Sequence, residues 1–541
     1  MTQKIHTNLF YGIYRYLNNT IFTNVMFSPG VHIAISGMAI TAILYLCGNL
    51  SYVPGIGWHT ADDHMITQRV AYHFWNSGVP YYNVDSAVAA NTSLFWPILL
   101  SPLYAVFSPA HAIPFVVGLS LLFWVPIIIF SVSYFSNVLE KIGVSIPLMF
   151  TPSVLSYSAT GWEHIPQTLF VTVGMIGILY SSQKLSKLTI PEWAFIIICL
   201  SFLMRPDSAI TILIIGSAWF ITNERYRYIR TYAIMLVLLM LPVSYLFLMD
   251  IFYGSFVPNT AHLKVGGFME NVENGIGYIV SPFRSGPVPI LILFNILAIK
   301  SLRKEEVVLL TAALGHLAYV VVTGGDVFGS GRLFLIYLPI MTVITISVAS
   351  RNIRKHSATA EIVAYSVAIV LLLNGPRIVD ETMLKRERFG EGKEAQKEQI
   401  KLAEVIKQRI DPSDGTVGLH YLGIGYHMLN FTITDFLGKA EPHIARSEAK
   451  VGPIGHNKWD YEYAFKTYDI AIIPMRIAHH EKWGKAKEKK IEEKKWMYWD
   501  VLSKKLEKNG DYRFVYPKEM GVRNDKWGVY VKTDLIEKIK R

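Results

Sequence analysis

The chain has 541 residues, of which 52% are hydrophobic and only 17% are charged. Soluble proteins carry about a quarter charged residues, so the composition excludes an ordinary soluble protein. The net charge of +11 does not indicate nucleic-acid binding, because much of the positive charge lies in short loops between apolar runs, where basic residues orient a protein in a bilayer. Both cysteines, Cys47 and Cys199, lie in apolar stretches, which excludes a disulfide framework and a cysteine-based metal site.

Long apolar runs between residues 32 and 374 predict membrane-spanning helices, which need about 20 apolar residues each. We expect about eleven spans, at 32–50, 112–136, 143–158, 165–181, 190–204, 207–222, 229–249, 287–299, 306–322, 333–350 and 360–374. The first run is expected to be an uncleaved helix. The run at 93–107 is equally apolar, but Pro97 and Pro102 interrupt it, and we interpret it as a helix in the outer interface.

The charge of the connecting loops gives the expected orientation. With eleven spans, every basic loop falls on one face, and the positive-inside rule makes that face cytoplasmic. These loops are 139–143, 184–187, 223–230, 300–306 and 351–356. The sequence therefore predicts an α-helical polytopic membrane protein, with a transmembrane domain at 1–374 and a soluble α/β domain at 375–541 outside the cytoplasm.

The loops on the opposite face carry acids, histidines and cations, and we expect these side chains to converge on one site. The loops are 59–69, 159–164, 204–208, 253–264 and 324–332. Adjacent acids such as Asp62 and Asp63 are usually a solvated turn or a helix cap, but here they precede an amphipathic stretch. A carboxylate at a membrane surface could act as a general base toward an acceptor hydroxyl. Together with His64, the pair could instead bind a divalent cation.

The cations of the outer loops have two interpretations. Arg205, Lys264 and Arg332 end apolar segments, where a single basic residue often extends toward the membrane interface. Three of them together would suit a phosphate head group. Glu163 and His164 form a helix cap or an acid/base pair, with the two interpretations about even. The glycines around Asp326 lack the context of a nucleotide-binding loop and favour a tight turn, which an Asp326–Arg332 ion pair could close.

Taken in chain order, these stretches resemble the motifs of the type C (GT-C fold) glycosyltransferases. The resemblance is greatest to the branch containing the mycobacterial terminal arabinofuranosyltransferase and the bacterial arabinosyltransferases that modify pilin, and it covers about residues 60–475. The matching residues are Asp62, Asp63, Ile66 and Arg69; Asn83 and Asn91–Ser93; Ala159–Glu163; Arg205–Asp207; Tyr253, Gly254, Pro258–Thr260 and Lys264; Gly324–Asp326, Gly331 and Arg332; Asp435; Pro442–Ala445; and Gly455–Lys458. Trp162 and His64 depart from the usual aliphatic and small residues, so we expect the donor or acceptor contacts to differ at these positions.

The resemblance implies an inverting transfer of a sugar, D-arabinofuranose in this branch, from a polyprenyl-phosphate donor to an extracytoplasmic glycan or pilin-like protein. It places the protein in a bacterial inner membrane, with its active site on the periplasmic side. Asp62 or Asp63 would be the catalytic base. The residues expected to contact the donor phosphate or substrate are Arg69, Glu163, His164, Arg205, Asn259, His262, Lys264, Asp326, Arg332, His456 and Lys458. A divalent cation is the one cofactor that the acids could bind.

Two other classes of protein compete with this interpretation. A transporter or flippase of a lipid-linked or anionic substrate would carry ionisable residues inside its spans and often internal repeats, whereas these spans hold few charges and show no repeat. A membrane-anchored receptor would bind its ligand through residues 375–541, which contain no glycine-rich phosphate loop and no metal-ligand spacing. The sequence therefore favours the transferase.

Overall fold

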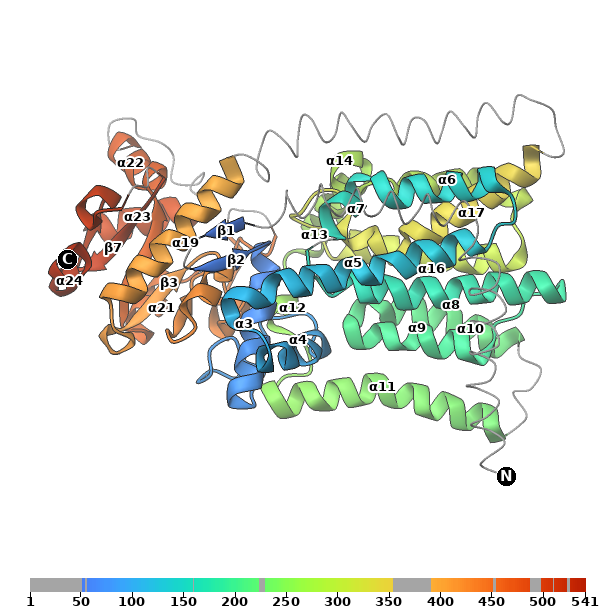
Figure 1. Ribbon diagram of the computed structural model, residues 1–541, viewed down its shortest axis with the longest axis horizontal. Coiled ribbons are helices and arrows are strands. Elements are labelled where there is room, and N and C mark those ends of the chain that lie inside the picture. The colour runs from blue at the N-terminus through green and yellow to red at the C-terminus, as the bar shows by residue number, and fades with distance from the viewer. Residues whose placement is uncertain are drawn as a thin grey trace. The chain divides into compact units, whose positions relative to one another are not determined.

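The computed structural model describes residues 51–53, 56–158, 160–222, 229–353, 391–450, 454–486, 498–508, 510–522 and 526–541. The expected spans at 32–50 and 360–374, the expected domain boundary near 374 and most of the basic loop at 223–230 lie outside these residues. The chain divides into two compact units. The helical unit includes residues 116–245 and 269–353, and the sheet unit includes residues 51–115, 246–268 and 391–541 (Figure 1).

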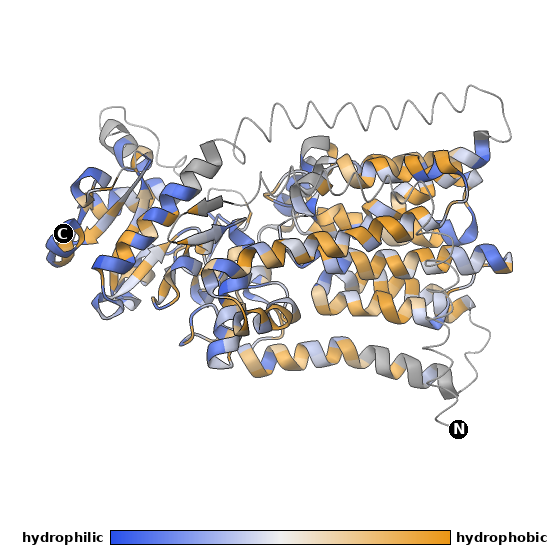
Figure 2. Ribbon diagram, viewed as in Figure 1, coloured by the Kyte–Doolittle hydropathy of each residue, from blue (hydrophilic) through white to orange (hydrophobic). Residues whose placement is uncertain are grey.

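Long apolar helices dominate the helical unit, as the hydropathy colouring of Figure 2 shows. Four helical segments of the described chain are long and apolar enough to cross a membrane: α5 (Pro109–Ser133), α8 (His164–Leu185), α16 (Lys304–Val322) and Arg332–Asn352, which contains η6 (Arg332–Tyr337) and most of α17 (Leu338–Ile353). The other α-helices of this part of the chain are α6 (Val138–Phe150), α7 (Pro152–Tyr157), α9 (Glu192–Met204), α10 (Ala209–Thr222), α11 (Ile229–Tyr253), α13 (Phe268–Val280), α14 (Pro282–Ser285) and α15 (Val288–Leu297). The number of spans stays a prediction.

Glycines let α8 and α9 pack closely. A Cβ atom at Gly174 would lie 2.7 Å from the carbonyl oxygen of Ala194, and one at Gly177 would lie 2.2 Å from the ring of Trp193. Small residues at such positions bring helix backbones together where burial of apolar surface gives no driving force. The contact fixes the polar ends of the two helices, Glu163 before α8 and Arg205 after α9, in one place.

The sheet unit contains a five-stranded sheet in the order β4-β3-β5-β7-β6, which confirms the predicted α/β class of the C-terminal domain. Its strands are β3 (Thr416–Leu419), β4 (Ile433–Asp435), β5 (Ile470–Arg476), β6 (Tyr512–Val515) and β7 (Trp527–Lys532). β3 runs parallel to β4 and β5, whereas β7 runs antiparallel to β5 and β6. Neighbouring residues of β7 belong to different apolar clusters, so the sheet is buried on both faces.

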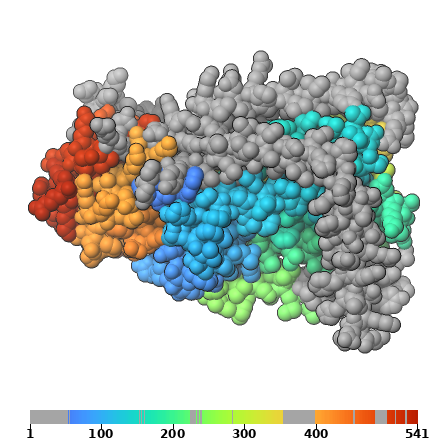
Figure 3. All heavy atoms as spheres, viewed as in Figure 1, coloured from blue at the N-terminus to red at the C-terminus, as the bar shows by residue number. Residues whose placement is uncertain are grey.

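The first outer loop, residues 51–111 between the first two expected spans, belongs to the same unit as this sheet. β1 (Ser51–Val53) and β2 (Gly57–His59) pair antiparallel and are followed by α3 (Asp62–Ser77). Ile66 and Val70 of α3 are buried in one of the apolar clusters that cover the sheet. The domain expected at 1–374 therefore gives residues 51–115 and 246–268 to the unit that holds the C-terminal sheet. On the face drawn in Figure 3, atoms of the first outer loop lie against atoms of the C-terminal domain.

The remaining elements of the sheet unit are short. The run at 93–107, predicted as one interface helix, forms α4 (Phe95–Leu100) and the 3₁₀ helix η2 (Ser101–Ala105), because the prolines limit each helix. The other elements are α12 (Asn259–Leu263), α19 (Glu391–Arg409), η8 (Pro412–Asp414), η9 (Leu422–Met428), α20 (Pro442–Arg446), α21 (Tyr461–Thr467), α22 (Ile477–Ala486), α23 (Tyr498–Lys508), η11 (Pro517–Met520) and α24 (Ile536–Lys540). Among these, η9 packs on α3, and α20 packs on α12.

Candidate active site

The two adjacent aspartates form the first turn of α3, where the positive end of the helix dipole favours acids. Asp62 Oδ1 accepts a hydrogen bond from the backbone N–H of Gly423, at 2.7 Å. A Cβ atom at position 423 would come within 2.6 Å of the same oxygen, so only glycine allows this approach. Burial raises the pKa of Asp62 to about 6, although the charge of Lys439 acts in the opposite direction. A carboxylate with such a pKa is suited to accept a proton near neutral pH.

Asp63 has a different partner. Its Oδ1 lies 2.6 Å from Nζ of Lys439, and both side chains are partly buried, with 27% and 17% exposed. Lys439 is not among the site residues predicted from the sequence. The sequence signal for it is Gly438, which follows the motif residue Asp435 and, with a φ of +82° in the structure, forms the turn that places Lys439.

Arg69 has a structural role in the sheet unit. It is 1% exposed, and its guanidinium donates hydrogen bonds to four backbone carbonyls, those of Tyr82, Gly425, Met428 and Phe431. A further hydrogen bond joins it to the side chain of Asn83, at 3.4 Å. These bonds use the five donors of the guanidinium. Arg69 was predicted to contact the donor phosphate or substrate, and the structure instead uses it to hold α3 against η9.

His64 is also buried, and its side chain contacts other residues of the sheet unit. It is fully buried, its Nε2 lies 2.8 Å from the amide nitrogen of Gln68, and burial lowers its pKa to about 3. Tyr104 extends this polar chain by donating to the amide oxygen of Gln68, at 2.9 Å. His64 therefore does not join Asp62 and Asp63 in a ligand set. Within the described ranges, no group of three or more His, Cys, Asp or Glu side chains could hold a metal ion.

A group of cations surrounds α12 and α20. Lys458 is 4% exposed and donates to the backbone carbonyls of His262 and Ala445, each at 2.9 Å, which ties α12 to α20. The pKa of His262 is lowered by burial and by the charges of Arg446 and Lys458. Lys264 follows α12 and is half-buried. This segment therefore concentrates positive charge, as an anion-binding surface requires.

Two other predicted residues lie near these cations in the sequence. Asn259 begins α12 and is 5% exposed. Its side-chain amide donates to the backbone carbonyls of Gly438 and Lys439, at 2.6 and 3.1 Å. His456 is half-buried in the loop that precedes Lys458. The structure thus connects Asn259 with the turn that carries Lys439.

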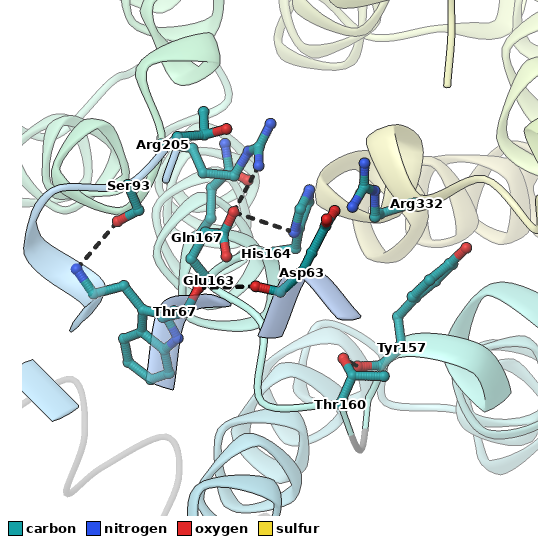
Figure 4. A network of polar contacts seen from close by, with 12 residues as sticks. Asp63, Thr67, Ser93, Tyr157, Thr160, Glu163, His164, Gln167, Arg205 and Arg332 are labelled. Carbon is teal, nitrogen blue, oxygen red and sulfur yellow. Dashed lines mark hydrogen bonds and ion pairs between the residues drawn. The ribbon is translucent and has the colours of Figure 1, made fainter. Parts of the chain in front are cut away.

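The helical unit holds a second polar network, at the outer ends predicted for α8 and α9 (Figure 4). Arg205 lies between two carboxylates, with Nη1 2.7 Å from Glu163 and both Nε and Nη2 3.0 Å from Asp207. Gln167 donates to the other oxygen of Asp207, at 2.6 Å. His164 Nδ1 lies 3.9 Å from Glu163, so the predicted pairing of these neighbours is a weak contact. Asp207 was matched to a family motif but not predicted as a site residue.

Arg332 is the second arginine of the helical unit. It forms a two-pronged ion pair with Asp326, at 2.7 and 2.9 Å, and this is the ion pair expected to close the glycine-rich turn. The guanidinium also lies 4.8 Å from the ring centre of Trp162 and 4.3 Å from that of Phe328. Gly331 has a φ of +69°, and a Cβ atom there would lie 2.2 Å from the carbonyl oxygen of Ser285. The turn therefore depends on glycine, as predicted.

Comparison with known proteins identifies the fold. No protein-family model and no curated protein matches the sequence. Among solved structures, the chain is similar to ArnT from Cupriavidus metallidurans, with a TM-score of 0.52, 10% identity, and coverage of 94% of this chain and 99% of ArnT. It is also similar to the oligosaccharyltransferase AglB from Archaeoglobus fulgidus in complex with an inhibitory peptide and a dolichol-phosphate, with a TM-score of 0.51, 11% identity, and coverage of 93% and 77%.

The chain therefore has the GT-C fold. A third structure agrees, that of the Archaeoglobus fulgidus oligosaccharyltransferase in complex with Zn and sulfate, with a TM-score of 0.53, 12% identity, and coverage of 93% and 76%. The GT-C fold and the four long apolar helices of the described chain support a membrane location. The predicted fold class is confirmed at this level, whereas the arabinofuranosyltransferase branch stays a prediction.

Proposed function

We propose that this protein is a membrane glycosyltransferase that moves a sugar from a polyprenyl-phosphate donor to an acceptor hydroxyl outside the cytoplasm. The observation that carries the proposal is the environment of Asp62 at the start of α3. Its carboxylate is held by the Gly423 N–H, and burial raises its pKa to about 6. The GT-C fold supports the lipid-linked donor, since the similar structure of AglB is a complex with a dolichol-phosphate.

In the proposed reaction, Asp62 removes the proton of the acceptor hydroxyl as the hydroxyl oxygen attacks the anomeric carbon of the donor. The new bond forms on the face opposite the phosphate, and the bond between the anomeric carbon and the phosphate oxygen breaks. The electron pair of that bond leaves with polyprenyl phosphate, and the sugar is transferred with inversion. Asp62 is the better base of the pair because Asp63 is held in an ion pair with Lys439.

The leaving phosphate gains charge as the bond breaks, and positively charged side chains would stabilise it. We assign this role to Lys264 and Arg332. Lys264 belongs to the cationic segment around α12, and Arg332 offers a planar, always charged group beside aromatic rings. The proposed sugar is D-arabinofuranose, the proposed acceptor is a glycan or a pilin-like protein, and the proposed location is the periplasmic side of a bacterial inner membrane.

A donor panel tests the function. Purified protein is incubated with polyprenyl-phosphate sugars of different stereochemistry, with an acceptor extract from the source membrane, and free polyprenyl phosphate is measured. We expect release with one donor, and release at least about a hundredfold slower with protein in which Asp62 is replaced by asparagine. Accumulation of intact donor on the other leaflet of a vesicle, without release of polyprenyl phosphate, would instead identify a transporter.

A further inference from the structure

The ion pair between Asp63 and Lys439 solves a problem that two adjacent carboxylates create. Asp62 and Asp63 repel each other, and the negative charge of Asp63 raises the pKa of Asp62. Lys439 places a positive charge 2.6 Å from Asp63 and also acts on Asp62 in the direction that favours its ionised form. The groups that act on this cation in turn are the two aspartates and Asp435.

The backbone around Lys439 is held by a buried carboxylate. Asp435, at the end of β4, is 1% exposed and accepts hydrogen bonds from the N–H groups of Leu437 and Ala440, at 2.8 and 2.6 Å. Gly438 completes the turn with a φ of +82°, and a Cβ atom there would lie 2.7 Å from the N atom of Ala445. These contacts hold the backbone of the turn, and Lys439 lies within it.

Asn259 holds the same turn from a distant part of the sequence. Its amide donates to the carbonyls of Gly438 and Lys439, while its own backbone N–H donates to the carbonyl of Ala89, at 3.0 Å. The amide lies 179 residues before Gly438 in the chain. An asparagine at the start of a short helix can bond its own helix, but this one uses both amide hydrogens on the turn.

We propose that Lys439 is a positioning residue of the active site, which holds Asp63 so that Asp62 alone faces the acceptor hydroxyl, and that Asn259 acts by fixing Lys439. This inference rests on the proposed glycosyltransfer and reassigns Asn259 from substrate contact to support of the Lys439 turn. The geometry assigns the role because Lys439 reaches Asp63 from a turn bonded on both sides, by Asp435 and by Asn259. A lysine on a loose surface loop would contribute little.

The test is the pH dependence of single-turnover transfer by Lys439→Met. An opposite charge nearby lowers the pKa of a carboxyl by roughly 1–3 units, so its loss should move the acid limb of the profile to higher pH by about one unit or more. Lys439→Arg keeps the positive charge, so the acid limb of its pH profile should lie at the wild-type pH. Lys407→Met is the matched control, because it removes a lysine that pairs with Glu404 at 2.9 Å in the same unit. An unshifted limb in Lys439→Met would overturn the inference.

The role of Asn259 is tested by comparing Asn259→Ala and Lys439→Met alone and together in a double-mutant cycle. If it acts through Lys439, Asn259→Ala should move the acid limb in the same direction as Lys439→Met and by no more than that variant does, and it should add little to the loss in Lys439→Met. Additive losses would show that Asn259 has a separate role and would contradict the second half of the proposal. Thermal unfolding of each variant in detergent distinguishes a variant that does not fold from one that folds with Lys439 misplaced.

The proposed function and this inference can fail separately. If the wild type transfers no sugar at all, the proposed function fails, whereas normal wild-type transfer with an unshifted Lys439→Met profile rejects only this inference.

Discussion

Asp62 and Asp63 are identical and adjacent, yet their surroundings give them different chemistry. One accepts a backbone hydrogen bond and is left with a raised pKa, and the other is paired with a lysine. Because successive residues of a helix point in different directions, only one of them can readily reach a given hydroxyl. We therefore propose Asp62 as the base and Asp63 as the partner of Lys439, because their surroundings differ.

Replacement of each aspartate by asparagine separates the roles. Asn keeps the shape of Asp but cannot take a proton, so Asp62→Asn should lose transfer by about a hundredfold to ten-thousandfold while still binding the lipid donor. Asp63→Asn should transfer sugar with a weaker affinity for the acceptor. Donor binding and single-turnover transfer are measured for both variants. Normal transfer by Asp62→Asn together with a complete loss in Asp63→Asn would reverse the assignment.

The raised pKa of Asp62 gives a pH dependence. The base must be ionised to accept a proton, and its pKa is about 6, above the ordinary value for aspartate. Transfer should therefore be full above pH 7 and should fall about tenfold for each unit below pH 6. The profile is measured under single-turnover conditions, with acceptor in excess. An acid limb near pH 4 would mean that Asp62 is not the titrating base.

The proposed phosphate-binding cations are tested in the same assay. Lys264→Ala and Arg332→Ala should each raise the barrier to transfer by about 2–4 kcal/mol, which corresponds to a loss of roughly 30-fold to 900-fold. Arg284→Ala is the control, because Arg284 is exposed, donates to the backbone carbonyl of Asp326 in the same turn, lies 5.5 Å from the ring centre of Tyr278, and is not assigned to the phosphate. Near-normal turnover by folded Lys264→Ala and Arg332→Ala would remove both residues from the phosphate site.

At the scale of elements, α3 is held in place by one buried arginine. Removal of the Arg69 guanidinium takes a hydrogen-bond donor from four backbone carbonyls, of which that of Met428 keeps a bond from the N–H of Phe431. Each buried group left unpaired costs about 1–3 kcal/mol. Arg69→Met should therefore lower the free energy of unfolding by at least about 3 kcal/mol. Donor affinity of the fraction that remains folded should be unchanged, because the side chain contacts no proposed substrate group.

Thermal unfolding in detergent measures the first effect, and binding of a polyprenyl-phosphate sugar measures the second. Arg513→Met is the control, since Arg513 is 58% exposed and its ion pair with Glu519 spans 3.6 Å. A variant of Arg69 that unfolds like the wild type but binds donor poorly would restore the role first predicted from the family motif.

At the scale of the whole molecule, the orientation in the membrane stays a prediction from loop charge. Single cysteines at exposed Ser413 and exposed Lys304, in a chain with Cys47 and Cys199 replaced by serine, should react differently with an impermeant reagent. In intact cells lacking an outer barrier, Ser413→Cys should be labelled and Lys304→Cys should not. The opposite result would place the C-terminal domain in the cytoplasm.

Apolar runs and loop polarity predicted the helical membrane class and the α/β domain, because both depend on local pattern. Local pattern also predicted the Asp326–Arg332 ion pair, whose partners are six residues apart. Lys439 and the role of Arg69 could not be predicted this way. The partner of Lys439 lies 376 residues away in sequence, and three of the carbonyls that Arg69 bonds lie more than 350 residues away. No periodicity links positions at such separation.

The bonds of Arg69 also set the order in which the protein can be assembled during synthesis. Three of its acceptors are made 356, 359 and 362 residues after it, which at about 5–20 residues per second is a delay of roughly 20–70 seconds. During this time the ribosome has already produced every described helix of the helical unit. The aspartate pair reaches its final surroundings only when η9 and the Lys439 turn emerge, so a nascent or prematurely terminated chain would lack the arrangement on which the proposed base depends.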